Sequence, residues 1–165
     1  MSVLITVASR HRSTAEIGEA IAGALREAGF ATGIDSRVAD VMSRDVVTVL
    51  ADATLGDAAE LMAGFGISGL PVVDDDGLLT GVLSETDLVR LRSGAPPTRS
   101  WHALLVRDLM TTPAIVVQSE APVHEAAGVM ANRRIHRLFV VDRDGVPVGV
   151  LSESDVVAEI ADLDE

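Results

Sequence analysis

The sequence contains two copies of one segment, and this duplication limits the possible folds more than any other feature of the chain. A shift of 68 residues places Val38–Val89 on Val106–Val157 without a gap, and about 23 of the 52 aligned positions are identical. Two copies are too few for an open solenoid. We therefore expect a closed pair with pseudo-twofold symmetry, in which each copy covers the apolar face of the other.

The first half of each copy reads as a strand followed by a helix. In the first copy the β-branched run at 46–49 predicts a short strand. Thr54 with Asp57 three residues later is typical of a capping box, and Gly66 marks the end of the helix. Four residues at helical spacing are expected to face the core: Ala58, Leu61, Met62 and Phe65.

The second half of each copy reads as a hairpin and a second helix. Leu70–Val73 is expected to be a buried strand, Asp75–Gly77 a turn, Leu78–Leu83 the partner strand and Ser84–Leu91 a helix. The second copy repeats the whole order with strands and helices at Ile115–Val117, Val123–Asn132, Leu138–Val141, Val146–Leu151 and Glu153–Ile160.

The predicted fold class is therefore α/β of the α+β type, with two βαββα repeats and an N-terminal strand–helix extension. The boundaries are expected at 1–35 for the extension, 36–92 for repeat 1, 93–105 for the linker and 106–165 for repeat 2. Gly94, Pro96 and Pro97 give the linker its loop character.

Composition argues against several functional classes. The chain is 48% hydrophobic but has no apolar run of about 18 residues, so no membrane span is predicted. The net charge of −12, without a block of Lys or Arg, argues against nucleic-acid binding. The absence of cysteine fits a cytoplasmic protein. His102 and His124 lack partners at metal-ligand spacing, and no residue is marked as a nucleophile, so neither a metal site nor catalysis is predicted.

One element that ends a strand and opens a helix occurs in both copies. It is Gly-Val-Leu-Ser-Glu-Thr-Asp at 81–87 and Gly-Val-Leu-Ser-Glu-Ser-Asp at 149–155. The amides of a helix start favour an anion, a serine hydroxyl can bind an anionic oxygen and an aspartate can accept hydrogen bonds from ribose hydroxyls. The same spacing is also a plain capping box. Both interpretations stay open at this point.

The order of elements resembles that of cystathionine-β-synthase (CBS) domains. The Leu-Pro-Val-Val-Asp strand, the Asp-Gly turn and the Gly-Val-Leu-Ser-x-x-Asp ending carry the resemblance, and two such units resemble a Bateman module. The resemblance covers 36–165. It implies a cleft between paired sheets that takes AMP, ADP, ATP or S-adenosylmethionine.

The resemblance also implies which residues bind the ligand. Ser84 with Asp87, and Ser152 with Asp155, would bind at the two helix starts, with the aspartates on ribose. The expected adenine walls are apolar residues of the first two strands of each copy: Val47, Thr48, Val49, Leu70 and Pro71, then Val116, Val117, Leu138 and Phe139.

A basic cluster distinguishes the two copies. Repeat 2 has Arg-Arg-Ile-His-Arg at 133–137, where repeat 1 has Phe-Gly-Ile-Ser-Gly at 65–69. Arg134, His136 and Arg137 are therefore candidate phosphate ligands, because an anion in so acidic a chain needs local positive charge. The alternative is a solvated basic helix end. We expect one cleft to bind nucleotide better than the other.

The first 32 residues lie outside the repeat. Val3–Ala8 reads as a strand, Ser9–Ser13 as a loop and Thr14–Ala28 as an amphipathic helix. This order resembles the opening of a flavodoxin, although Arg12 stands where that family has glycine. The alternative is an added strand and helix used in dimerisation. Deletion of 1–32 is then expected to weaken self-association and leave nucleotide binding intact.

The function that the resemblance implies is regulatory rather than catalytic, with an adenine nucleotide or S-adenosylmethionine as ligand and no required cofactor. A homodimer is expected, and the effect would pass to a separate regulated protein. Two alternatives remain: a flavin (FMN)-dependent redox protein with CBS regulation, and a structural or dimerisation module with no ligand.

Overall fold

The computed structural model describes residues 36–93 and 103–162. The predictions made for the N-terminal strand and helix therefore lie outside the described residues. In chain order the elements are α2 (Val38–Val41), β1 (Val49–Leu50), α3 (Leu55–Phe65), β2 (Gly69–Val73), β3 (Leu79–Ser84), α4 (Glu85–Ser93), the 3-10 helix η2 (Val106–Asp108), β4 (Val116–Gln118), α5 (Val123–Arg133), β5 (Arg137–Val141), β6 (Pro147–Ser152) and α6 (Glu153–Asp162).

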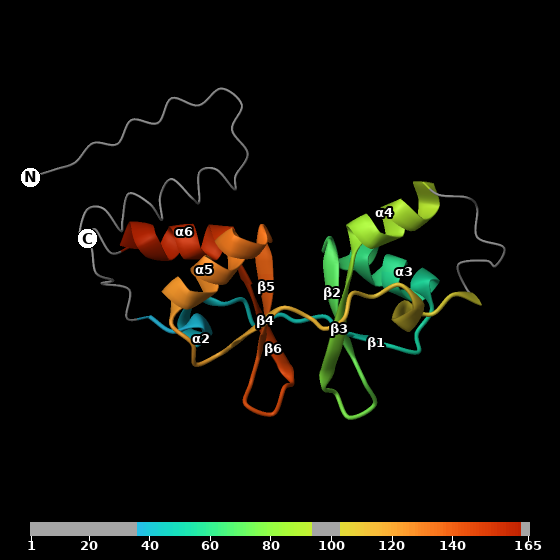
Figure 1. Ribbon diagram of the computed structural model, residues 1–165, viewed down its shortest axis with the longest axis horizontal. Helices are drawn as coiled ribbons and strands as arrows, with labels where there is room; N and C mark the ends of the chain where they lie inside the picture. Colours follow the sequence, from blue (N-terminus) through green and yellow to red (C-terminus); the bar gives the residue numbers. More distant parts are fainter. Residues whose placement is uncertain (1–35, 94–102, 163–165) are drawn as a thin grey trace, which may run out of the picture.

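The strands form two equivalent sheets, in the orders β1-β2-β3 and β4-β5-β6. In each sheet the first strand is parallel to the second, and the second is antiparallel to the third. The two sheets stand side by side, with α3 and α4 on the outer side of one sheet and α5 and α6 on the outer side of the other (Figure 1). The expected mixed α/β fold with two βαββα repeats is confirmed.

Local sequence signals set the ends of α3. Thr54 is the N-cap, its side chain accepts the amide of Asp57, and the Asp57 carboxylate accepts the Thr54 amide, as the capping-box pattern predicts. Gly66 ends the helix with φ of 64°, a left-handed conformation that costs glycine little. The equivalent residue after α5 is Arg134, with φ of 55°. The two helices thus end in the same turn, once with glycine and once with arginine.

The segment before the first strand of each repeat packs on the other repeat. The Val38 amide donates to Ala121 O and the equivalent Val106 amide donates to Ala53 O, both at 2.9 Å. Figure 1 shows α2 beside the repeat that contains α5 and α6. Val38 and Met42 belong to the hydrophobic core of repeat 2, and Val106 to that of repeat 1. The two repeats therefore exchange their N-terminal segments.

Two glycines allow this exchange. A Cβ at Gly81 would lie 2.8 Å from Met110 Sδ and 2.9 Å from Thr111 O, because the exchanged segment crosses directly over β3. The equivalent Gly149 of β6 would meet Met42 in the same way. Antiparallel bridges join the crossing segment to the strand at each point, Val82 to Thr111 and Ser43 to Val150.

Each repeat has its own aliphatic core. Leu55, Ala58 and Met62 of α3 are buried, so the predicted helical stripe is largely confirmed. The prediction for Phe65 is wrong, because its side chain is 63% exposed. The buried stripe of α3 runs at 55, 58 and 62, and Phe65 lies in the last turn beyond the core. It instead lines a surface cavity with Val46, Val47 and Ile67.

Candidate functional site

The two Ser–Asp helix starts have the geometry of capping boxes. In repeat 2, Ser152 Oγ and the Ser152 amide donate to Asp155 Oδ2 at 2.6 and 2.7 Å. In repeat 1, Ser84 makes the same two bonds to Asp87 Oδ2 at 2.6 and 2.9 Å. Within the described residues each carboxylate uses only Oδ2 in this box. Oδ1 of each aspartate remains an acceptor for an external donor such as a ribose hydroxyl.

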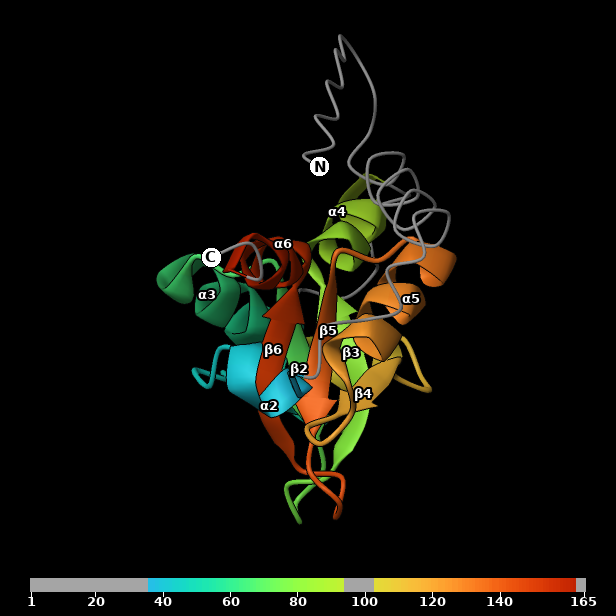
Figure 2. The same cartoon turned by 90° about the vertical axis from the view of Figure 1, so that its left-hand side faces the viewer.

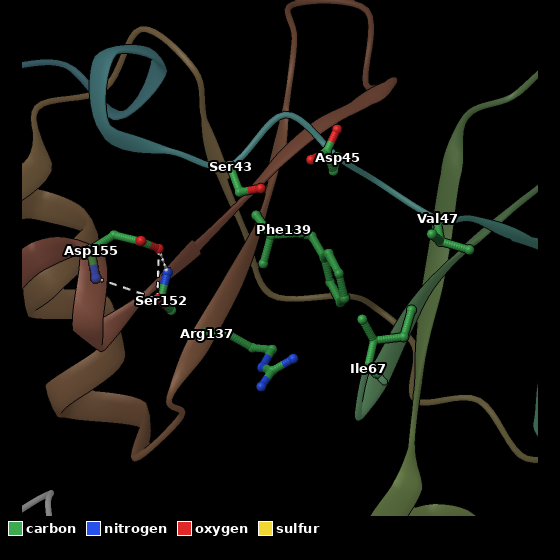
Figure 3. A pocket seen from close by; sticks show the side chains of 10 residues that line it. Ser43, Asp45, Val47, Ile67, Arg137, Phe139, Ser152 and Asp155 are labelled. Carbon is green, nitrogen blue, oxygen red and sulfur yellow. Dashed lines mark hydrogen bonds between the residues drawn. The ribbon is translucent and has the colours of Figure 1, made fainter. Parts of the chain in front are cut away.

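A cleft opens at the Ser–Asp start of repeat 2 (Figure 3). Its volume is about 290 Å³, close to the lower end of small-molecule sites. It is built by both repeats, including the segment between α2 and β1 that crosses from one repeat to the other. The lining residues are Ser43, Asp45, Val47, Ile67, Gly69, Arg137, Phe139, Val150, Ser152 and Asp155.

The cleft combines an apolar slot with polar ends. Phe139, which is only 5% exposed, faces Val47 and Ile67 of the other repeat (Figure 3). Asp155 and Ser152 lie on one side of the slot, and the Arg137 guanidinium projects into the opening (Figure 3). Flat apolar walls suit a planar ring, and the aspartate and arginine suit hydroxyl and anionic groups respectively.

The structure brings five of the predicted site residues together in this cleft: the polar Arg137, Ser152 and Asp155 and the wall residues Val47 and Phe139. Ser84 and Asp87 lie at the equivalent helix start of repeat 1. Of the other two basic candidates, His136 is on the surface with Nδ1 2.9 Å from Glu153 Oε2, and Arg134 is exposed at the end of α5.

Most of the expected apolar wall lies elsewhere. The hydrophobic cores contain Val49, Leu70, Val117 and Leu138, while Pro71 is fully buried and Thr48 is exposed on the surface. Alternate residues of a strand point to opposite faces. Leu138 therefore points toward the helices and its neighbour Phe139 toward the cleft.

Sequence reasoning missed five of the cleft residues, namely Ser43, Asp45, Ile67, Gly69 and Val150. Ile67 and Gly69 belong to repeat 1, and Asp45 lies on the crossing segment. Their role depends on how the two repeats pack, which no local pattern encodes. The comparison of the two repeats offered an indirect signal for Gly69, because Gly69 is the residue of repeat 1 that corresponds to Arg137 in the basic cluster of repeat 2.

Within 36–93 and 103–162 no group of three His, Asp or Glu side chains could hold a metal ion. No helix in the same part of the chain is long and apolar enough to cross a bilayer.

Two interleaved βαββα repeats with a cleft between them, bounded by a Ser–Asp helix start, define a paired-repeat module. A sequence profile of the CBS domain matches residues 38–94 and again 106–162, more than half of the chain. The chain belongs to the CBS domain family, as a tandem pair.

Relatives of known sequence show where such pairs occur. The chain is 30% identical over 118 residues to inosine-5'-monophosphate dehydrogenase of Methanocaldococcus jannaschii, covering 72% of this chain and 22% of that protein. It is also 30% identical over 137 residues to the chloroplastic CBS domain-containing protein CBSX1 of Arabidopsis thaliana, covering 68% of this chain and 58% of CBSX1. The chain thus spans less than two thirds of these relatives.

Solved structures support the same fold. The crystal structure of CBSX2 in complex with AMP has a TM-score of 0.68 and 31% identity, covering 78% of this chain and 98% of that one. Hypoxic Response Protein I, solved with two coordinated zinc ions, has a TM-score of 0.64 and 27% identity, covering 74% of this chain and 98% of that one.

Proposed function

We propose that this chain is a regulatory CBS pair that binds an adenine nucleotide in the cleft at Ser152 and Asp155. The observation that carries the proposal is the convergence of three chemically distinct groups on one cleft: the Asp155 carboxylate, the Arg137 guanidinium and the slot beside Phe139. These groups match ribose, phosphate and purine. The AMP-bound CBSX2 structure supports this choice of ligand class.

The arrangement favours binding over catalysis. The lining offers acceptors, one cation and apolar walls, which hold a ligand without a nucleophile activated by a neighbouring base. A bound ligand shifts a protein between conformations only by its differential affinity for them. The ligand contacts both repeats and the crossing segment, so its binding energy depends on how the two repeats are placed. We propose that a separate partner protein senses the relative placement of the two repeats. The cytoplasmic location of the protein stays a prediction.

A thermal-shift series with AMP, ADP, ATP and S-adenosylmethionine tests the proposal. A ligand at 100 times its Kd stabilises the folded state by about 2.7 kcal/mol. For a chain of this size that corresponds to a rise in Tm of roughly 5–10 °C. No shift with any of the four ligands would instead favour a structural module without a ligand.

Paired variants separate binding from folding. Asp155→Asn and Asp87→Asn change equivalent capping boxes, so both are expected to alter the Tm of the free protein by similar amounts. Only Asp155→Asn is expected to reduce the shift caused by AMP, because Asp155 lines the cleft. Equal loss of the AMP shift in both variants would contradict this assignment.

A homodimer is the second part of the proposal. Val89 of α4 and Val157 of α6 are equivalent residues, 63% and 57% exposed. Both views place α4 and α6 along the same face of the molecule (Figures 1 and 2). Two exposed apolar residues on the same face favour contact with a second copy. Sedimentation of a Val89→Glu, Val157→Glu double variant is expected to show monomers, and an unchanged dimer would place the interface elsewhere.

A further inference from the structure

Asp45 lines the cleft, but the ligand contacts proposed above give it no role. It is an exposed residue on the segment that crosses from one repeat to the other, between α2 and β1. Within residues 36–93 and 103–162 its carboxylate has no hydrogen bond or ion pair, whereas the Asp155 carboxylate accepts two hydrogen bonds from Ser152. Both oxygens of Asp45 are therefore available to accept hydrogen bonds from a ligand.

Asp45 lies on the side of the slot that faces away from the Ser–Asp helix start. It lines the cleft together with Val47 and Ile67, and the same three residues also line the neighbouring surface cavity. In Figure 3 these three residues lie on the side of the Phe139 ring, and the Ser–Asp start lies on the other side. A purine in the slot, with its ribose at Asp155, therefore has an edge directed toward Asp45.

We propose that Asp45 selects the base of the nucleotide by accepting a hydrogen bond from the 6-amino group of adenine. This inference rests on the proposed function and deepens it, because it names the residue that recognises the base. A carboxylate can only accept hydrogen bonds, so it favours an amino group at carbon 6 over the oxygen that guanine and hypoxanthine carry there. Ser43, the other polar lining residue of the crossing segment, can donate as well as accept and does not select between them.

A thermodynamic cycle isolates this contact, because the protein and the ligand can each lose one partner. Calorimetric titration compares AMP with purine riboside 5′-monophosphate, which lacks the 6-amino group and keeps the ribose and the phosphate. The wild type is expected to bind AMP about tenfold to a hundredfold more tightly, the range for a hydrogen bond to a charged group. Asp45→Ala is expected to bind the two ligands with the same Kd. The ratio of the two Kd values excludes general charge effects, because both ligands carry the same phosphate.

Asp75→Ala is the matched control. Asp75 is exposed in the turn between β2 and β3, is not among the residues that line the cleft, and its replacement changes the net charge by the same amount. This variant is expected to keep the wild-type ratio of the two Kd values. A second measurement needs no variant at Asp45: GMP, with an oxygen at carbon 6, is expected to bind the wild type more weakly than AMP.

The outcomes distinguish this inference from the function on which it rests. Equal wild-type affinity for AMP and purine riboside 5′-monophosphate, tighter binding of GMP than of AMP, or a preference for AMP that persists in Asp45→Ala would overturn the role of Asp45 and leave nucleotide binding intact. Failure of the wild type to bind any of the three nucleotides would overturn both proposals. A preference for AMP that is present in the wild type and in Asp75→Ala, and lost in Asp45→Ala, would support the inference.

Discussion

Replacement of Arg134 by glycine is expected to stabilise the folded protein. Arg134 ends α5 with φ of 55°, and the equivalent residue after α3 is Gly66 with φ of 64°. The left-handed conformation brings the Cβ of an L-residue close to its own backbone, which costs about 1–2 kcal/mol. Glycine has no Cβ and avoids this cost. Gly66, in the equivalent turn of the same protein, therefore serves as the reference for the change at Arg134.

The net gain is smaller than the conformational cost. Glycine adds freedom to the unfolded chain, which lowers stability by about 0.4–1 kcal/mol. The difference leaves Arg134→Gly about 0.5–1 kcal/mol more stable than the wild type. For a chain of this length the Tm is expected to rise by roughly 1–4 °C. The reverse change, Gly66→Arg, is expected to lower stability by about 0.5–1 kcal/mol, because the cost of a Cβ in this turn is partly offset by the lower freedom of the unfolded chain.

Urea unfolding followed by circular dichroism measures both free energies. The linear extrapolation gives the free energy of unfolding and an m value, and an unchanged m value shows that the same surface unfolds in each variant. A decrease in stability for Arg134→Gly would refute the reasoning, since the arginine side chain would then contribute more than its backbone conformation costs. Stabilisation would show that the Arg134 side chain contributes less to folding than its backbone conformation costs.

The remaining predictions concern packing and capping. Gly81→Ala is expected to destabilise the fold by about 1–3 kcal/mol, because its Cβ would press on Met110 of the crossing segment. Gly128→Ala, in open space within α5, is the matched control and is expected to gain about 0.5–1 kcal/mol in urea unfolding. Equal effects of the two changes would contradict the close crossing. Thr54→Ala is expected to lose about 1 kcal/mol because the Asp57 amide loses its side-chain acceptor, and a neutral result would show that water caps α3 equally well.

Features that depend on local chemistry were predictable from the sequence. The capping box of Thr54 and Asp57 and the left-handed end at Gly66 involve residues within one or two helical turns of each other. The hairpin glycines Gly77 and Gly145 have φ of 80° and 89°, as their Asp-Gly turns predict. The duplication itself showed that these features occur twice and that the two units form a pair.

Features that depend on how the repeats meet were not predictable. The cleft is lined by residues of both repeats, and the exchange of the segments before β1 and β4 decides which residues these are. A strand pattern shows that alternate residues face opposite sides, but it does not show which side faces the other repeat. Leu138 was therefore expected on the cleft wall, although it belongs to the core. Phe65 followed the helical spacing and still lies outside the core.

The exchanged segments make a single repeat self-complementary. A single repeat would lack the valine and methionine that the other repeat packs into its core, and its own valine and methionine would have no core to enter. Two identical repeats could therefore complete each other's cores across a true twofold axis. If a linker joins two such repeats in one chain, the same contacts can form, but the two repeats no longer need to have the same sequence. Gly69 and Arg137 show such a difference, since two identical chains would carry the same residue at both positions, whereas one chain can carry a different residue in each half.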